Sequence, residues 1–341
     1  MKVLNRPGMR RGGALLAVLW LAAALAAVAF SAAQIVRAGR ERTINQVEGV
    51  QAALLASAAT ERGLLHMRWG GSVRLPDGRP KFWDGEQPYV RLVFPSGEAL
   101  VAFVPESSKM DVNGASDEAL TRLGVALGLA PPAAQQISAA IVHWRTRTDE
   151  LSALDGWYLR VNPTFRAPHT SFQQIEELLS VYGITPDLYY GGIVRTADGA
   201  WYARPGLRDC LSVFGRKSGF DAATVRPEVL AASGVSARTI TAILGFRQQL
   251  PITRERWQAF AGTLGSEATA VRWGAGSNVY TIRATARVRR ADGSLSELRR
   301  SATLTVLLGP SYDRSGYRII DSRSGASTRP LALDPVEAAW R

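Results

Sequence analysis

Histidine and cysteine, the side chains best suited to bind a transition metal, are few in this sequence and lie far apart. The chain contains three histidines and one cysteine: His66, His143, His169 and Cys210. No two of them have the CxxC or HExxH spacing that places two ligands on one metal ion. A zinc site therefore has little support, and each histidine is more readily explained as a surface residue or a satisfied core residue. A single cysteine forms no intrachain disulfide, and Cys210 is expected to be a small buried hydrophobic side chain.

Sequence motifs for covalent catalysis and for phosphate binding are also missing. There is no Gly-x-Ser-x-Gly elbow, which would expose a nucleophilic serine. Residues 215–218, GRKS, lack the spaced upstream glycine of a phosphate loop, and residues 274–276, GAG, are not followed by the third glycine of a dinucleotide-binding turn. The sequence therefore predicts that the protein is not an enzyme.

The N-terminal region contains a long apolar run. No charged side chain occurs between Gly12 and Val36, and the run GALLAVLWLAAALAAVAFSAA is long enough to cross a bilayer as a helix. We therefore predict a transmembrane segment over residues 13–36. The charges on its two sides are Lys2, Arg6, Arg10 and Arg11 before it, and Arg37, Arg40, Glu41 and Arg42 after it. The positive-inside bias favours a cytoplasmic N-terminus, with the polar remainder outside the cytoplasm.

Helical periodicity continues beyond the apolar run. Apolar residues recur at three- and four-residue steps at Ile44, Val47, Val50, Leu54, Ala58 and Leu65. One helix from Ala14 to Met67 would be on the order of 80 Å long, with residues 37–68 packing against a folded domain outside the membrane. The alternative is a cleaved secretory signal peptide, with Ser31 and Ala33 at the positions that signal peptidase reads.

Strand-like patterns occur in two separate stretches of the chain, and the second stretch alternates. The first contains the runs YVRLVF and EALVAFV, joined at residues 95–97 through a glycine-containing turn. The second contains the runs YTIRATARV and SATLTVLL, separated by a turn at residues 291–293. Because two or three strands alone bury little surface, we predict that both stretches, within residues 69–109 and 266–341, form one antiparallel sheet.

Residues 110–265, between the two stretches, have helical patterns. Capping signals precede apolar helical runs at Ser116, Ser171 and Ser236. The predicted fold class is α+β. A long N-terminal helix packs on an antiparallel sheet, and a large all-α domain is inserted between strands of that sheet.

The start of the chain resembles a type IV prepilin signal. Residues 10–20, RRGGALLAVLW, have a basic leader that ends in glycine before an Ala-Leu-Leu run, as in the K minor pseudopilins of type II secretion systems. This resemblance implies a leader over residues 1–12, cleavage by a prepilin peptidase after Gly12, and N-methylation of Gly13. It also places Ala17 where most pilins have a glutamate, and K pseudopilins resemble pilins that have lost this glutamate.

The helical block carries further resemblance to the same family. The segments are residues 111–116 (DVNGAS), 140–145 (AIVHWR), 171–179 (SFQQIEELL), 183–186 (GITP) and 220–230 (FDAATVRPEVL). Their order along the chain is similar to that of the family's inserted domain. The resemblance implies a pilin-like fold whose inserted α domain contains helix-hairpin-helix-like modules.

The resemblance also implies a function and a location. A K pseudopilin is a non-enzymatic subunit at the tip of the type II secretion pseudopilus, where it initiates assembly and supports protein export across the outer membrane. The implied partners are I- and J-type minor pseudopilins, the prepilin peptidase, inner-membrane lipid and a secreted substrate. The implied location is the bacterial inner membrane, crossed once, with the bulk of the chain in the periplasm.

K pseudopilins are associated with calcium, which acidic residues of the inserted domain hold. By this resemblance the candidate calcium ligands are Asp149, Glu150 and Asp155. Calcium requires several hard oxygen ligands. In residues 145–150, RTRTDE, cations and threonines stand where the family has carboxylates. A solvated loop without calcium is therefore the favoured alternative.

Helix-hairpin-helix modules bind DNA in other proteins, and a net charge of +12 with a pI near 10.4 suits an anionic partner. The hairpin positions at residues 183–185 and 234–236 lack the second glycine that lets a backbone approach a phosphate. We therefore predict no nucleic-acid partner. The alternative function is that of a periplasmic helix-hairpin-helix binding protein, exported by a signal peptide and used, for example, in DNA uptake.

Overall fold

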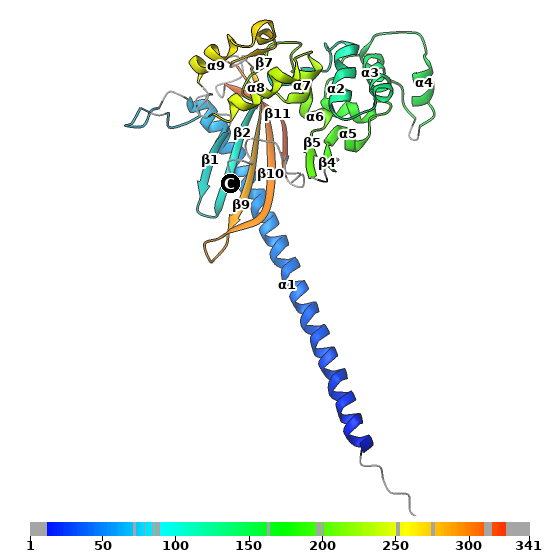
Figure 1. The fold of residues 1–341 in the computed structure, drawn as a ribbon, viewed down its shortest axis with the longest axis vertical. Coiled ribbons are helices and arrows are strands. Elements are labelled where there is room, and N and C mark those ends of the chain that lie inside the picture. Colours follow the sequence, from blue (N-terminus) through cyan, green and yellow to red (C-terminus); the bar gives the residue numbers. More distant parts are fainter. Residues whose placement is uncertain are drawn as a thin grey trace, which may run out of the picture. The chain divides into compact units, whose positions relative to one another are not determined.

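The fold of the chain is given by a computed structural model (Figure 1). The structure describes residues 12–70, 73–78, 80–83, 85, 89–161, 164–195, 199, 201–249, 253–273, 277–309 and 316–324. The expected leader lies outside these residues, apart from Gly12 itself. The chain divides into two compact units, Met1–Gln51 and Ala52–Arg341.

The first unit is the N-terminal part of helix α1, which runs without interruption from Gly12 to Trp69 (blue in Figure 1). This helix is long and apolar enough to cross a membrane, since an 18-residue window within it has a mean hydropathy of 2.4. The hydroxyl of Ser31 donates to the carbonyl oxygen of Ala27 at 2.8 Å, so this polar group is satisfied inside the helix itself. The prediction of one continuous helix is confirmed.

The second unit contains a five-stranded antiparallel sheet. Its strands are β1 Tyr89–Phe94, β2 Gly97–Pro105, β9 Val279–Arg289, β10 Leu295–Leu308 and β11 Tyr317–Ser324, in the spatial order β1-β2-β9-β10-β11. Strand β2 pairs with β9 along its whole length, from Gly97 opposite Val288 to Pro105 opposite Tyr280. Because β2 and β9 flank the helical block in the sequence, that block is inserted between strands of one sheet, as predicted.

Strand β11 is an addition that the sequence patterns did not indicate. Ile319 and Ile320 are adjacent rather than alternating, which hides the two-residue period of a strand. Antiparallel pairing with β10, with a register shift between Thr305 and Val306, gives this segment its backbone hydrogen bonds. Pairing with a neighbour, and not local pattern, therefore makes residues 317–324 a strand.

Small residues let the C-terminal part of α1 pack closely on the sheet. Ala56 and Ala59 are fully buried in one hydrophobic cluster with alternate residues of β2. A Cβ atom at Gly63 would lie 2.8 Å from Val101 Cγ1 and 3.0 Å from Ile282 Cγ2. Any side chain at this position would force the helix and the sheet apart, so the close contact requires glycine.

The inserted block folds around its own core. Its helices are α2 Asp117–Ala126, α3 Pro131–Arg145, α4 Ala153–Tyr158, α5 Pro186–Tyr190, α6 Leu207–Cys210, α7 Pro227–Ala232, α8 Ala237–Arg247 and α9 Arg254–Ala261, with 3-10 turns η2 Glu106–Ser108, η3 Ile175–Ser180 and η4 Gly265–Ala270. One hydrophobic cluster extends from Met110 to Val271 and includes the fully buried rings of Tyr158 and Tyr189. A second cluster joins α1 to the sheet. The block is therefore stabilised by a core of its own.

Short strands complement the helices of the block. Strand β3 (Met110–Asp111) pairs in parallel with β6 (Leu211–Ser212), and β7 (Phe220–Asp221) pairs in parallel with β8 (Val271–Arg272). A small hairpin joins β4 (Gly192–Arg195) to β5 (Trp201–Arg204). Two-residue strands have no sequence periodicity, so only the folded chain can reveal them.

Two helix pairs, α2–α3 and α7–α8, begin with the same kind of turn. Asp111 Oδ1 accepts a hydrogen bond from the backbone N–H of the second residue after it, at 2.9 Å. Asp221 Oδ1 accepts one from the backbone N–H of the second residue after it, at 3.1 Å. A glycine with positive φ separates the helices of each pair, Gly128 at 88° and Gly234 at 86°. This connectivity is what a helix-hairpin-helix-like module requires.

In both pairs, the last residue of the second helix is an arginine whose side chain contacts the turn that opens the pair. Arg145 donates to the carbonyl oxygens of the first and fourth residues after Asp111. Arg247 donates to those of the first and fourth residues after Asp221, at 2.8 and 2.7 Å. Each arginine therefore ties the end of its helix pair to the beginning.

Candidate metal centre

The N-terminus of α4 holds the carboxylate of Asp155 in place. Ser152 caps this helix through a capping box, in which Ser152 Oγ accepts from Asp155 N at 3.3 Å and Asp155 Oδ2 accepts from Ser152 N at 2.8 Å. Ser152 Oγ also donates to Asp155 Oδ2 at 2.8 Å. The cap occupies Oδ2 and leaves Oδ1 to face other segments.

Two histidines converge on that second oxygen. His143 lies in the last turn of α3, and its Nε2 atom is 3.3 Å from Asp155 Oδ1. His169 lies in the loop between α4 and η3, and its Nε2 atom is 3.0 Å from the same oxygen. The two imidazole rings are nearly perpendicular, with centroids 4.8 Å apart. One ligand atom from each of the three residues lies within 4.8 Å of the other two, which is close enough for one ion to reach all three.

Asp155 supplies a buried negative charge at the centre of this trio. Its exposed fraction is only 3%. Burial by itself would raise the pKa of Asp155, but hydrogen bonds from Ser152, His143 and His169 outweigh burial and hold the pKa well below its usual range. At neutral pH the carboxylate is ionised and able to bind a cation.

His169 is held in an unusual backbone conformation. Its φ angle is 47°, the one positive value at a non-glycine residue in the part of the chain that the structure describes. The side chain is also anchored, because Nδ1 lies 3.2 Å from the carbonyl oxygen of Thr146. Since a carbonyl oxygen only accepts hydrogen bonds, Nδ1 is the donor in this contact. Nε2 is thereby directed at Asp155.

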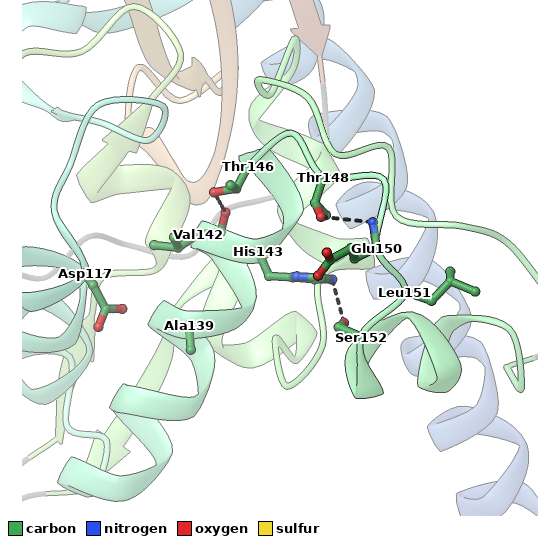
Figure 2. A pocket seen from close by; sticks show the side chains of 9 residues that line it. All are labelled: Asp117, Ala139, Val142, His143, Thr146, Thr148, Glu150, Leu151 and Ser152. Carbon is green, nitrogen blue, oxygen red and sulfur yellow. Dashed lines mark hydrogen bonds between the residues drawn. The ribbon is translucent and has the colours of Figure 1, made fainter.

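A cleft of about 560 Å³ reaches one side of the trio. Its lining residues are Asp117, Ala139, Val142, His143, Thr146, Thr148, Glu150, Leu151 and Ser152 (Figure 2). Figure 2 shows the His143 ring directed toward Ser152, whose Oγ lies 3.2 Å from His143 Nε2. The cluster therefore borders solvent on the side of His143 and Ser152.

The structure separates the three candidate calcium ligands. Asp155 belongs to the histidine trio, whereas Asp149 and Glu150 are exposed. Within the described residues, this trio is the one group of three or more such side chains with metal-binding spacing, and it includes neither Asp149 nor Glu150. Calcium binding by Asp149, Glu150 and Asp155 stays a prediction.

The expectation that the histidines are scattered was wrong for two of them. His143 and His169 are far apart in the sequence, but the chain turns back after α4 and brings them together. His66 contacts Phe82 instead, with ring centroids 5.2 Å apart. Cys210 is free and buried, and burial raises the pKa of its thiol. The one local signal for the site is the Ser-x-x-Asp capping pattern at residues 152–155, which predicts an immobilised carboxylate.

The expected processing residues lie at the beginning of α1. Gly12 is the first residue of the helix, and Gly13 and Ala17 are exposed. Cleavage after Gly12 and methylation of Gly13 stay predictions.

Residues 99–191 match the family described as "Type II secretion system (T2SS), protein K". Over this segment, the chain is similar to that family. The matched segment begins within β2, ends after α5, and contains His143, Asp155 and His169. The resemblance found in the sequence is confirmed over this segment, and the trio lies within it.

One solved structure similar to this chain is "The Crystal Structure of the GspK-GspI-GspJ complex from enterotoxigenic Escherichia coli Type 2 Secretion System". The aligned chain is 16% identical, with a TM-score of 0.48, and the alignment covers 84% of this chain and 100% of that chain. No curated protein matches the sequence.

Proposed function

We propose that this chain is a type II secretion protein K, a non-enzymatic minor pseudopilin at the tip of the pseudopilus, where it initiates assembly and supports protein export across the outer membrane. The observation that carries the proposal is the family match over residues 99–191. The proposed partners are I- and J-type minor pseudopilins and a secreted substrate. A subunit with an apolar helix and a large inserted domain can anchor through the first and bind partners through the second.

Helix α1 is the proposed membrane anchor. It has no charged side chain between Gly12 and Val36, and its apolar side chains in this region are exposed, as contact with inner-membrane lipid requires. The cations before the apolar run favour a cytoplasmic N-terminus. The sheet and the inserted domain then lie in the periplasm.

Processing after Gly12 is a testable part of the proposal. The basic leader stays at the cytoplasmic face while the apolar run enters the bilayer, which presents the bond between Gly12 and Gly13 to a prepilin peptidase. Mass spectrometry of the protein purified from membranes is expected to find N-methylated Gly13 at the mature end. A mature end at Gln34 or its neighbours would contradict this and would favour a signal peptide.

The residue at position 17 supports a place at the end of the filament. In pilins generally, a glutamate at this position is thought to pair with the free amine of a neighbouring subunit, which offsets the cost of burying both charges. Ala17 cannot form this pair. A subunit without the pair, and with a bulky inserted domain, has no place in the repeating shaft.

Replacing Ala17 by Glu is expected to bring no gain in secretion, because the tip subunit has no use for the ion pair. The unpaired charge should disfavour membrane insertion by about 2 to 3 kcal/mol. Ala17→Leu is the matched apolar control and should leave both properties unchanged. The measurements are secretion in a host lacking its own copy of the gene and the membrane-bound fraction of each variant. Improved secretion by A17E, or labelling of the native protein along the filament shaft, would rule out the tip assignment.

A further inference from the structure

We propose that His143, Asp155 and His169 form a binding site for a divalent transition-metal ion, with Zn²⁺ as the best-matched ion. The protein supplies three ligands, His143 Nε2, His169 Nε2 and Asp155 Oδ1. A fourth position remains for water on the side of Ser152 and the cleft. This site differs from the expected calcium site in two of its three residues and in its chemistry.

The ligand types select zinc over calcium. Zinc binds imidazole nitrogen and carboxylate oxygen, commonly with four ligands in all, whereas calcium takes six to eight oxygen ligands. The trio offers two nitrogens and one oxygen. Such a set is too poor in oxygen for calcium and is of the kind that zinc uses.

The spacing of the ligand atoms also fits zinc. Metal–ligand bonds of about 2.0 to 2.2 Å in a tetrahedral arrangement place ligand atoms about 3.3 Å apart. The distances from Asp155 Oδ1 to the Nε2 atoms of His143 and His169 are 3.3 and 3.0 Å. These two pairs already have the spacing of a tetrahedral ion, and the ligand atoms of the two histidines lie within 4.8 Å of each other.

The groups around the ligands hold them in the orientation that a metal requires. Metal-binding histidines typically donate their other ring N–H to a carbonyl or carboxylate, and ligating carboxylates are themselves hydrogen-bonded. His169 Nδ1 donates to the carbonyl of Thr146 at 3.2 Å, and Asp155 Oδ2 accepts two hydrogen bonds from Ser152 at 2.8 Å. Two of the three ligands therefore already have the outer contact of a zinc site.

Electrostatics favour a positive charge between His169 and Asp155. His169 Nε2 lies 3.0 Å from the anionic Oδ1 of Asp155, and a metal ion between the two atoms would supply the positive charge that this contact favours. The positive φ of 47° at His169 shows that its surroundings hold it in place despite an unfavourable backbone.

A bound ion would join three segments of the inserted domain: the last turn of α3, the start of α4 and the loop before η3. Trp144, which follows His143 in the chain, is buried in the core of the domain, and so is Tyr158, which lies in the same helix as Asp155. Metal binding is therefore expected to stabilise this domain against unfolding.

The test uses the full chain, purified in detergent without a histidine tag and freed of metal by a chelator. Equilibrium dialysis against Zn²⁺ is expected to find about one ion per chain, unaffected by excess Ca²⁺, and Zn²⁺ is expected to raise the melting temperature. Cobalt in place of zinc should give the intense visible absorption of a tetrahedral site. The variants His143→Ala, Asp155→Asn and His169→Ala should each weaken binding by about 100-fold or more, since even outer contacts are worth about 10- to 100-fold.

Two control variants match these changes in chemistry. Asp149→Asn makes the same acid-to-amide change at an exposed position, and His66→Asn removes the histidine outside the trio. Both should bind zinc as the native chain does. Circular dichroism identifies any variant that does not fold. Absence of stoichiometric zinc, displacement by Ca²⁺, an octahedral cobalt spectrum of the native chain, or native affinity in a His143→Ala/His169→Ala double variant would each overturn the proposal.

Discussion

Replacing Glu106 by Leu is expected to lower the free energy of unfolding of the full chain by about 3 to 5 kcal/mol. This is the usual effect of removing one partner of a buried ion pair. Glu106 follows β2, at the point where the chain leaves the sheet for the inserted block, and is 4% exposed. Its Oε1 atom accepts from Lys109 Nζ at 2.8 Å and from Thr281 Oγ1, on β9, at 2.7 Å. Without the carboxylate, the largely buried ammonium of Lys109 loses its partner.

Denaturant titration in detergent, followed by tryptophan fluorescence, measures this effect. Glu297→Leu is the control, because Glu297 pairs with Arg287 but is 87% exposed at its side chain. An exposed pair of this kind contributes about 0 to 1 kcal/mol. Equal losses in the two variants would show that Glu106 does not act as a buried ion-pair partner.

The same carboxylate makes stability depend on pH. Burial by itself would raise the pKa of Glu106, but the charge of Lys109 and hydrogen bonds from Lys109, Ser212 and Thr281 hold the pKa below its ordinary value of 4.5. A lowered folded-state pKa contributes stability that is present above the unfolded value and is lost as pH falls through the folded pKa. The native chain should therefore lose stability below about pH 4.5, and Glu106→Gln should lose less over that range. Parallel pH curves would contradict this.

Replacing Arg247 by Leu is expected to lower the free energy of unfolding by roughly 2 to 4 kcal/mol, because two carbonyl oxygens lose a charged donor. Arg247 Nε donates to Ala222 O at 2.8 Å and Nη1 donates to Val225 O at 2.7 Å. Burial lowers the pKa of Arg247 to about 10, so the guanidinium still carries its charge at neutral pH. The loss of stability should be confined to the α7–α8 pair, because Arg247 joins the end of this pair to its opening turn.

Arg238→Leu makes the same change on the exposed side of α8 and is the control. Hydrogen exchange should show faster exchange in α7 and α8 for R247L and little change for R238L. Because Arg145 makes the corresponding contacts in the α2–α3 pair, Arg145→Leu should produce a similar loss confined to that pair. Wild-type stability in R247L would mean that water replaces the arginine at these carbonyls.

The elements predicted from the sequence are those with a local signal. Helix α1 has a long apolar run followed by helical periodicity. Strands β1 and β2 are short apolar runs joined at a glycine-containing turn, and β9 and the second half of β10 alternate. Their order also predicted the insertion, because short strands need a shared sheet to bury enough surface. Strand β11 and the two-residue strands have no such signal, since their hydrogen-bond partners lie far away in the sequence.

The sequence alone determined the long apolar run of α1, the α+β order of the blocks and the resemblance to the protein K family, which residues 99–191 match. It also contains the capping pattern that immobilises Asp155, because a helix cap depends on residues three positions apart. The meeting of His143 with His169 was decided only by the tertiary structure. A metal site of this kind depends on distances between side chains from separate segments, and those distances come from packing of the whole inserted domain and not from spacing along the chain.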